Sequence, residues 1–152
     1  MACSLADRIQ RDMVSAMKSR DERTLSVLRM LKASMQLAET EKGRTGELED
    51  SDVQSLIRRA VKQREEAAEL YKNGNASERA AAELEEAKIL QEYLPAQLDD
   101  QALNDIAAGV IKQLNANGAQ DMGRVMGRVM QEVSGRADGK RVKDTVVKLL
   151  GN

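Results

Sequence analysis

The sequence contains no histidine, tryptophan or phenylalanine, and its only aromatic residues are Tyr71 and Tyr93. Without histidine, imidazole cannot act as a general base, and zinc and iron sites lose their commonest ligand. Two tyrosines give almost no platform on which nucleic-acid bases can stack, which argues against the RNA-binding sheets and barrels that read bases in this way. The composition therefore predicts no catalytic residue, no metal site and no cofactor.

Cysteine and long apolar runs are equally scarce. Cys3 is the single cysteine, so the chain forms no internal disulfide. No apolar run approaches the roughly 20 residues that a membrane-spanning helix needs. The N-terminal segment MACSLADRIQRDM also lacks the apolar core of a secretory signal. These absences predict a cytoplasmic protein that does not enter a membrane.

A single proline, Pro95, interrupts a chain in which almost every segment repeats its apolar residues at helical spacing. We expect an all-α fold, with an N-terminal multi-helix domain at 1–94 and a smaller C-terminal three-helix tail domain at 95–152. The boundary is placed at Leu94-Pro95, because the residue before a proline is pushed out of the α region.

Local signals predict where these helices begin, end and face the core. The predicted caps and stops are Ser4, Asp21, a capping box at 51–54, Lys72-Asn73-Gly74, Asp99 or Asp100, and Asn117-Gly118. We expect the second helix to end near Gly43. In the first helix, the predicted inward stripe is Leu5, Ile9, Met13 and Met17.

Residues 123–130 repeat the unit GRVM twice. Since four residues advance about 40° beyond one helical turn, each residue type forms its own stripe. The apolar arc consists of Met122, Met126, Met130, Val125, Val129 and Val133. Gly123 and Gly127 lie at its edge, and each costs about 0.8–1 kcal/mol relative to alanine. Two glycines on one stripe indicate close approach, either by a neighbouring helix or by the backbone of a ligand.

The stretch SGRADGKRV at 134–142 resembles a phosphate-binding P-loop but does not fit one. Only three residues separate Gly135 from Gly139, no serine or threonine follows Lys140, and no strand precedes the loop. The pattern predicts a turn in which Gly135 is left-handed and Asp138 caps the last helix. The start of that helix is then either an anion site suited to a phosphate or a plain cap with solvated cations.

Charge is distributed unevenly along the chain. The whole sequence carries a net charge of −1, but residues 121–152 hold seven basic and four acidic residues. The candidate residues for contacts to nucleic-acid phosphates are Arg124, Arg128, Arg136, Gly139, Lys140, Arg141, Lys143 and Lys148. The residues expected to shape the motif are Gly123, Met126, Gly127, Gly135, Ala137 and Asp138.

Four blocks together resemble the GatB/YqeY family, specifically its stand-alone YqeY-like members. They are DMVSAMKSRDERTLSVLRMLKA, VKQREEAAELY, EAKILQEYLPAQL and DMGRVMG with GRADGKRV. The resemblance implies a helical domain followed by a three-helix tail, related to the tail with which the B subunit of glutamine-dependent tRNA amidotransferase helps to hold tRNA. The tail match covers Gly123, Met126, Gly135, Arg136, Ala137, Asp138 and Gly139, adjoined by Lys140 and Arg141. Gln131, Glu132 and Ser134 stand where relatives often carry proline and lysines.

The resemblance and the local charge favour a non-catalytic module that interacts with tRNA and is linked to tRNA-dependent amidation or aminoacylation. An aminoacyl-tRNA synthetase or the amidotransferase is then the candidate protein partner. One alternative is a carbon–nitrogen ligase that uses glutamine as its nitrogen donor, although Cys3 without histidine supplies no activated nucleophile. The other is a protein-docking module that binds a synthetase or amidotransferase through the N-terminal helices.

Overall fold

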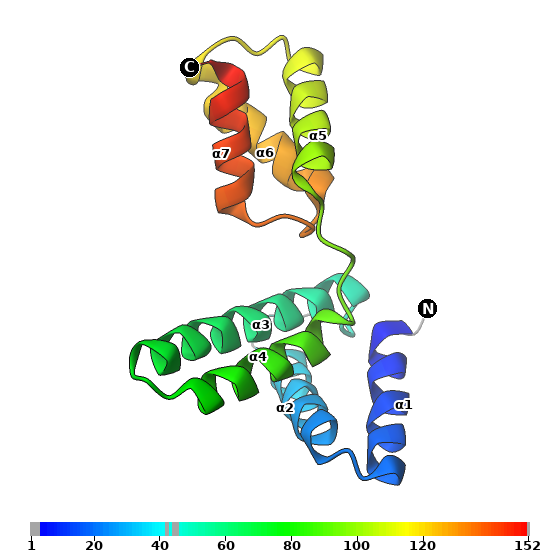
Figure 1. Ribbon diagram of the computed structural model, residues 1–152. Helices are drawn as coiled ribbons and strands as arrows, with labels where there is room; N and C mark the ends of the chain where they lie inside the picture. Colours follow the sequence, from blue (N-terminus) through cyan, green and yellow to red (C-terminus); the bar gives the residue numbers. More distant parts are fainter. Residues whose placement is uncertain (1–3, 42, 44–45, 152) are drawn as a thin grey trace. The chain divides into compact units, whose positions relative to one another are not determined.

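The computed structural model describes residues 4–41, 43 and 46–151, and within these residues it contains seven α-helices and no strand (Figure 1). The all-α prediction is confirmed. The helices are α1 (Ser4–Ser19), α2 (Glu22–Glu39), α3 (Asp50–Asn73), α4 (Ser77–Gln91), α5 (Asp100–Gln113), α6 (Met122–Val133) and α7 (Gly139–Leu150), with a short 3₁₀ turn, η1 (Ala119–Asp121), before α6. None of the described helices has both the length and the apolar character needed to cross a membrane.

The chain divides into two compact units, Met1–Leu94 and Pro95–Asn152. In the first unit, α3 and α4 form a long antiparallel hairpin that packs with α1 and α2 (Figure 1). Its core is mainly aliphatic, with Ile9, Leu28, Ile57 and Leu90 almost completely buried. Because these side chains recur at helical spacing on each helix, burial of one stripe per helix is sufficient to close the core.

One buried charge links three helices of the first unit. The Arg64 guanidinium on α3 is paired with Glu86 of α4, with 3.2 Å between Nε and Oε2. Its Nη2 also donates to Met30 Sδ of α2 at 3.7 Å. Since a buried cation without partners is strongly destabilising, these contacts explain how an arginine is tolerated on the buried face of α3.

The inward stripe of α1 differs from the predicted one at its last position. Met17 is 55% exposed, and Ala16 is buried in its place. A stripe extended by steps of four drifts about 40° with each step, so three steps from Leu5 carry Met17 out of the core-facing arc. A step of three from Met13 to Ala16 corrects the drift.

Several helix ends also differ from the predictions. The second helix ends at Glu39 rather than near Gly43, and the Thr40 hydroxyl donates to the Leu37 carbonyl at 2.8 Å. The capping box of α3 lies two residues earlier than 51–54, because the amide of Glu49 donates to Asp52 Oδ2 at 2.8 Å. A carboxylate on the third helical residue therefore defines this start, and the serine at position 51 does not.

The α1 helix begins at Ser4, as predicted, whereas the predicted end of α5 near Asn117-Gly118 is wrong for a local reason. The Ser4 hydroxyl donates to Asp50 Oδ2 at 2.6 Å, which joins α1 to the start of α3. The α5 helix ends at Gln113 because Asn115 already adopts a left-handed conformation, with φ of 50°. The caps at Asp21 and Asp99 are confirmed, since their carboxylates accept from the amides of residues 24 and 102.

The second unit is a three-helix bundle of α5, α6 and α7. Its core is formed mainly by small and branched apolar residues: Leu103, Ala107, Val110, Val125, Val129, Val133, Ala137, Val142 and Val146. The three valines of α6 are completely buried, as the predicted apolar arc requires. This packing fixes which faces of α6 and α7 remain open to solvent.

Candidate nucleic-acid interface

The exposed face of α6 carries the two arginines of the GRVM repeat. Arg124 Nη2 donates to Asp121 Oδ1 at 2.9 Å, and Arg128 Nε lies 3.5 Å from Glu132 Oε1. Both arginine side chains are about half exposed, at 53% and 54%. The backbone N–H of Asn117 donates to the other Asp121 oxygen and, together with Arg124, lowers the pKa of that carboxyl. Both guanidinium groups therefore have carboxylate partners, in pairs that remain open to water.

The glycines of the same helix face solvent. A Cβ atom built on Gly123 or Gly127 would have no neighbouring atom within 4 Å. The interpretation that a neighbouring helix approaches this stripe is therefore wrong for the described residues. The buried arc is centred on the valines, so residues at its edge point outward and the helix backbone is uncovered. Approach by a ligand backbone is the alternative that fits this geometry.

The methionines of α6 lie at the edge of the apolar arc and differ in how far they are exposed. Met122 and Met126 are half-buried against the core of the tail unit. Met130 at the C-terminal end of the helix is 39% exposed. The predicted arc thus consists of a valine centre that is fully packed and a methionine edge that is only partly covered.

The turn after α6 uses two left-handed residues. Ser134 has φ of 46° and Gly135 has φ of 79°. The sequence predicts this conformation at Gly135, and the structure shows that it begins one residue earlier, at Ser134. Ala137 then turns into the core, where it is 3% exposed. Asp138 caps α7, since its Oδ1 accepts from the amide of Arg141 at 2.8 Å.

Arg136 and Arg141, both candidate RNA contacts, are engaged within the tail unit. Arg136 Nε and Nη2 donate to the carbonyls of Val133 and Glu132, each at 3.0 Å, and so satisfy the C-terminal end of α6. Arg141 Nη2 donates to the Leu98 carbonyl at 2.8 Å and to Asp100 Oδ1 at 3.0 Å. These two guanidinium groups hold the fold of the motif.

A short segment before α5 makes two further hydrogen bonds to the turn between α6 and α7. The amide of Leu98 donates to the Arg136 carbonyl at 2.8 Å, and Gln97 Nε2 donates to the Gly135 carbonyl at 3.4 Å. Sequence reasoning missed residues 97–100, because they lie about forty positions from the turn and no local spacing links them.

The three candidate lysines of α7 differ from these arginines. Lys140, Lys143 and Lys148 are exposed, and among the described residues none has a hydrogen-bond or ion-pair partner. Gly139, the first residue of α7, has no neighbour within 4 Å of a built Cβ atom. The exposed Asp144 lies on the same side of the helix, between Lys140 and Lys148 in rotation. The structure therefore leaves the lysine ammonium groups and the start of α7 accessible.

Other kinds of site have little support in the part of the chain that the structure describes. No group of three or more histidine, cysteine, aspartate or glutamate residues there is placed to hold a metal ion. Cys3 lies outside the described residues.

The chain is thus an all-helical protein whose C-terminal unit is a three-helix bundle. The sequence matches the YqeY-like protein family over residues 6–150. The chain therefore belongs to this family, as the resemblance of its four blocks predicts. A similar protein is "Altered inheritance of mitochondria protein 41, mitochondrial" from Pyrenophora tritici-repentis. It is 27% identical over 149 residues, which cover 95% of this chain and 80% of the relative.

Proposed function

We propose that this protein is a non-catalytic accessory module that interacts with tRNA and is linked to tRNA-dependent amidation or aminoacylation. The contacts are made by Lys140, Lys143 and Lys148 of α7 together with Arg124 and Arg128 of α6. The observation that carries the proposal is the set of three exposed lysines without partners in a tail that is locally cationic. Free ammonium groups at a surface are suited to phosphate oxygens.

The ion pairs of Arg124 and Arg128 are compatible with this role. Both pairs are exposed and join residues three or four positions apart. Exposed pairs of this kind contribute about 0–1 kcal/mol and are screened by salt. A phosphate group, which accepts from a guanidinium in a bidentate manner, can replace the carboxylate at little cost.

The uncovered glycine stripe supports a role in RNA binding for the same face of α6. Gly123 and Gly127 remove the side chains that would otherwise keep a ligand away from the helix backbone. Arg124 and Arg128 lie next to them in the sequence and are rotated by about 100° around the helix. A sugar–phosphate strand that follows the glycine stripe is therefore within reach of the arginines.

Recognition of this kind reads phosphate positions and RNA shape. Two tyrosines are the only aromatic residues of the chain, and Tyr93 is buried, so stacking on bases contributes little. Five cationic contacts predict that the logarithm of the affinity falls with the logarithm of the salt concentration, with a slope of about −3.5 to −4.5. The link to amidation or aminoacylation rests on the resemblance of the tail to that of the amidotransferase B subunit.

A titration of labelled tRNA at several salt concentrations tests the proposal. The variant with Lys140, Lys143 and Lys148 replaced by alanine is expected to bind more weakly, with a slope shallower by about 2–3. A matched control is Lys62→Ala, because Lys62 is also exposed on a helix but lies in the first unit. Binding that is independent of salt, or that the triple variant leaves unchanged, would contradict the proposal.

A further inference from the structure

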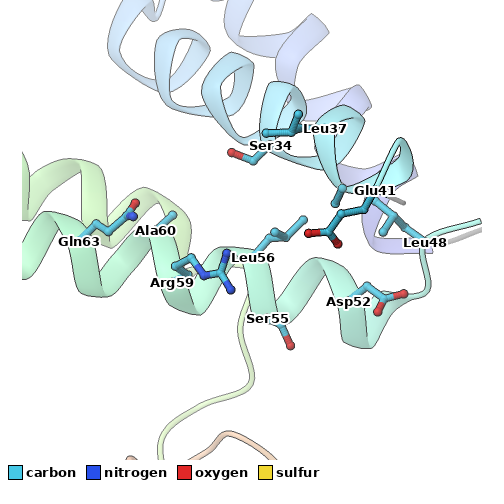
Figure 2. Close-up of a pocket in the computed structure, with 11 residues that line it drawn as sticks. Ser34, Leu37, Glu41, Leu48, Asp52, Ser55, Leu56, Arg59, Ala60 and Gln63 are labelled. Carbon is cyan, nitrogen blue, oxygen red and sulfur yellow. The ribbon is translucent and has the colours of Figure 1, made fainter. Parts of the chain in front are cut away.

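A hollow of about 400 Å³ lies in the first unit, between the outer faces of α2 and α3 (Figure 2). Leu37 of α2 stands at its edge and is 74% exposed, although leucine is usually buried. Leu56 and Ala60 of α3 contribute apolar surface to the floor and are half-buried. The hollow therefore combines a prominent apolar side chain with an apolar depression next to it.

The charges around the hollow have opposite signs at its two ends. Along α3, Asp52 and Arg59 both line the hollow and lie seven positions apart in the sequence, which places them on one helix face about 10 Å apart. Glu41, which follows α2, lies at the same end as Asp52, and its carboxylate is on the other side of Leu56 from Arg59 (Figure 2). Glu41 and Arg59 are exposed, and no side-chain hydrogen bond or ion pair joins either of them to another described residue.

We propose that this surface is where a second copy of the chain docks, about a two-fold axis that passes close to Leu56. A two-fold rotation exchanges the two ends of a surface, so it places the acidic end of one copy against the basic end of the other. Arg59 of each copy then faces Glu41 and Asp52 of the second copy, and the apolar side chains of Leu37 and Leu56 lie within the interface.

The charge pattern favours this occupant over other classes of ligand. RNA is disfavoured, because two carboxylates border the hollow against a single guanidinium. A surface with one sign of charge would repel its own copy, whereas this surface attracts it in one orientation only. The apolar centre with a polar border has the usual organisation of a protein–protein interface.

Sedimentation equilibrium over a range of protein concentrations tests the pairing. The wild-type mass is expected to rise from monomer to dimer as concentration increases, and to rise less at high salt. Arg59→Glu and Glu41→Arg are each expected to dimerise more weakly than the wild type, since each variant places like charges opposite each other; the loss should be larger for Arg59→Glu, because Asp52 still faces Arg59 in the Glu41→Arg variant. Both positions are exposed, so circular dichroism should show unchanged helix content in both variants.

The decisive sample is an equal mixture of the two variants. In a two-fold pair, an Arg59→Glu chain and a Glu41→Arg chain restore opposite charges at both contacts, so the mixture is expected to form heterodimers. Lys72→Glu, a charge reversal in the last turn of α3, should dimerise like the wild type. The proposal is overturned if the wild type stays monomeric up to about 1 mM, if either single variant dimerises like the wild type, or if the mixture remains monomeric.

Discussion

Replacing Arg141 or Lys140 with methionine should separate folding from RNA binding, because these adjacent cations have different surroundings. Arg141 Nη2 donates to the Leu98 carbonyl at 2.8 Å and to Asp100 at 3.0 Å. Lys140 is exposed and has no described partner. Both substitutions remove one positive charge and keep an unbranched side chain, so any difference between them reports on the contacts.

The contacts of Arg141 set the expected loss of stability. A hydrogen bond from a charged donor contributes about 1.5–3 kcal/mol. The pair with Asp100 adds about 0–1 kcal/mol, because the Asp100 side chain is 99% exposed. We therefore expect Arg141→Met to lower the free energy of unfolding of the tail unit by about 2–3 kcal/mol, while Lys140→Met changes it by less than about 0.5 kcal/mol.

The expected effects on tRNA binding are reversed. Lys140→Met should weaken binding and make the salt slope shallower by about 0.7–0.9, which corresponds to one phosphate contact. Arg141→Met should leave the slope unchanged under conditions where the tail remains folded. Arg141→Lys keeps the charge but loses the planar fork of the guanidinium, so most of the loss of stability should persist.

Urea denaturation followed by circular dichroism measures the stability of each variant. Since the two units can unfold separately, amide hydrogen exchange in α5 and α7 should assign the loss to the tail. Equal destabilisation by the two methionine variants would refute the structural role of Arg141. A shallower salt slope for Arg141→Met with unchanged exchange protection would refute it as well.

Two further predictions concern a glycine of α6 and a buried tyrosine. Gly127→Ala and the control Gly109→Ala, both in exposed helix with open space around the new methyl group, should each stabilise the tail by about 0.5–1 kcal/mol in thermal unfolding. Only Gly127→Ala should also weaken tRNA binding, and equal effects of both on binding would contradict the role of the glycine stripe. Burial, and the 2.5 Å hydrogen bond to Asp12, raise the pKa of Tyr93. The stability that this tyrosine provides is therefore complete below its unfolded pKa of about 10 and is lost as the pH rises further. The difference in unfolding free energy between wild type and Tyr93→Phe should shrink above about pH 10, and a difference independent of pH would contradict this.

The sequence by itself determined the helices and many of their caps. Asp21, Asp99 and Asp138 each accept from an amide three residues later. This contact lies within one helical turn, so residue type and spacing are sufficient to predict it. The same holds for the buried valines of α6, because period and hydrophobicity define one face of a helix. Predictions failed where a boundary depended on competing local signals, as at the ends of α2 and α5.

Only the tertiary structure decided the roles of the basic residues in the tail. In the sequence, Lys140 and Arg141 look alike as neighbouring cations, but Arg141 holds a carbonyl 43 positions away. The glycines of α6 are a similar case, since spacing alone could not distinguish a packed stripe from an open one. The physical reason is that the free energy of a charge or a bare backbone depends on what surrounds it. Those surroundings are assembled from segments that are distant in the chain.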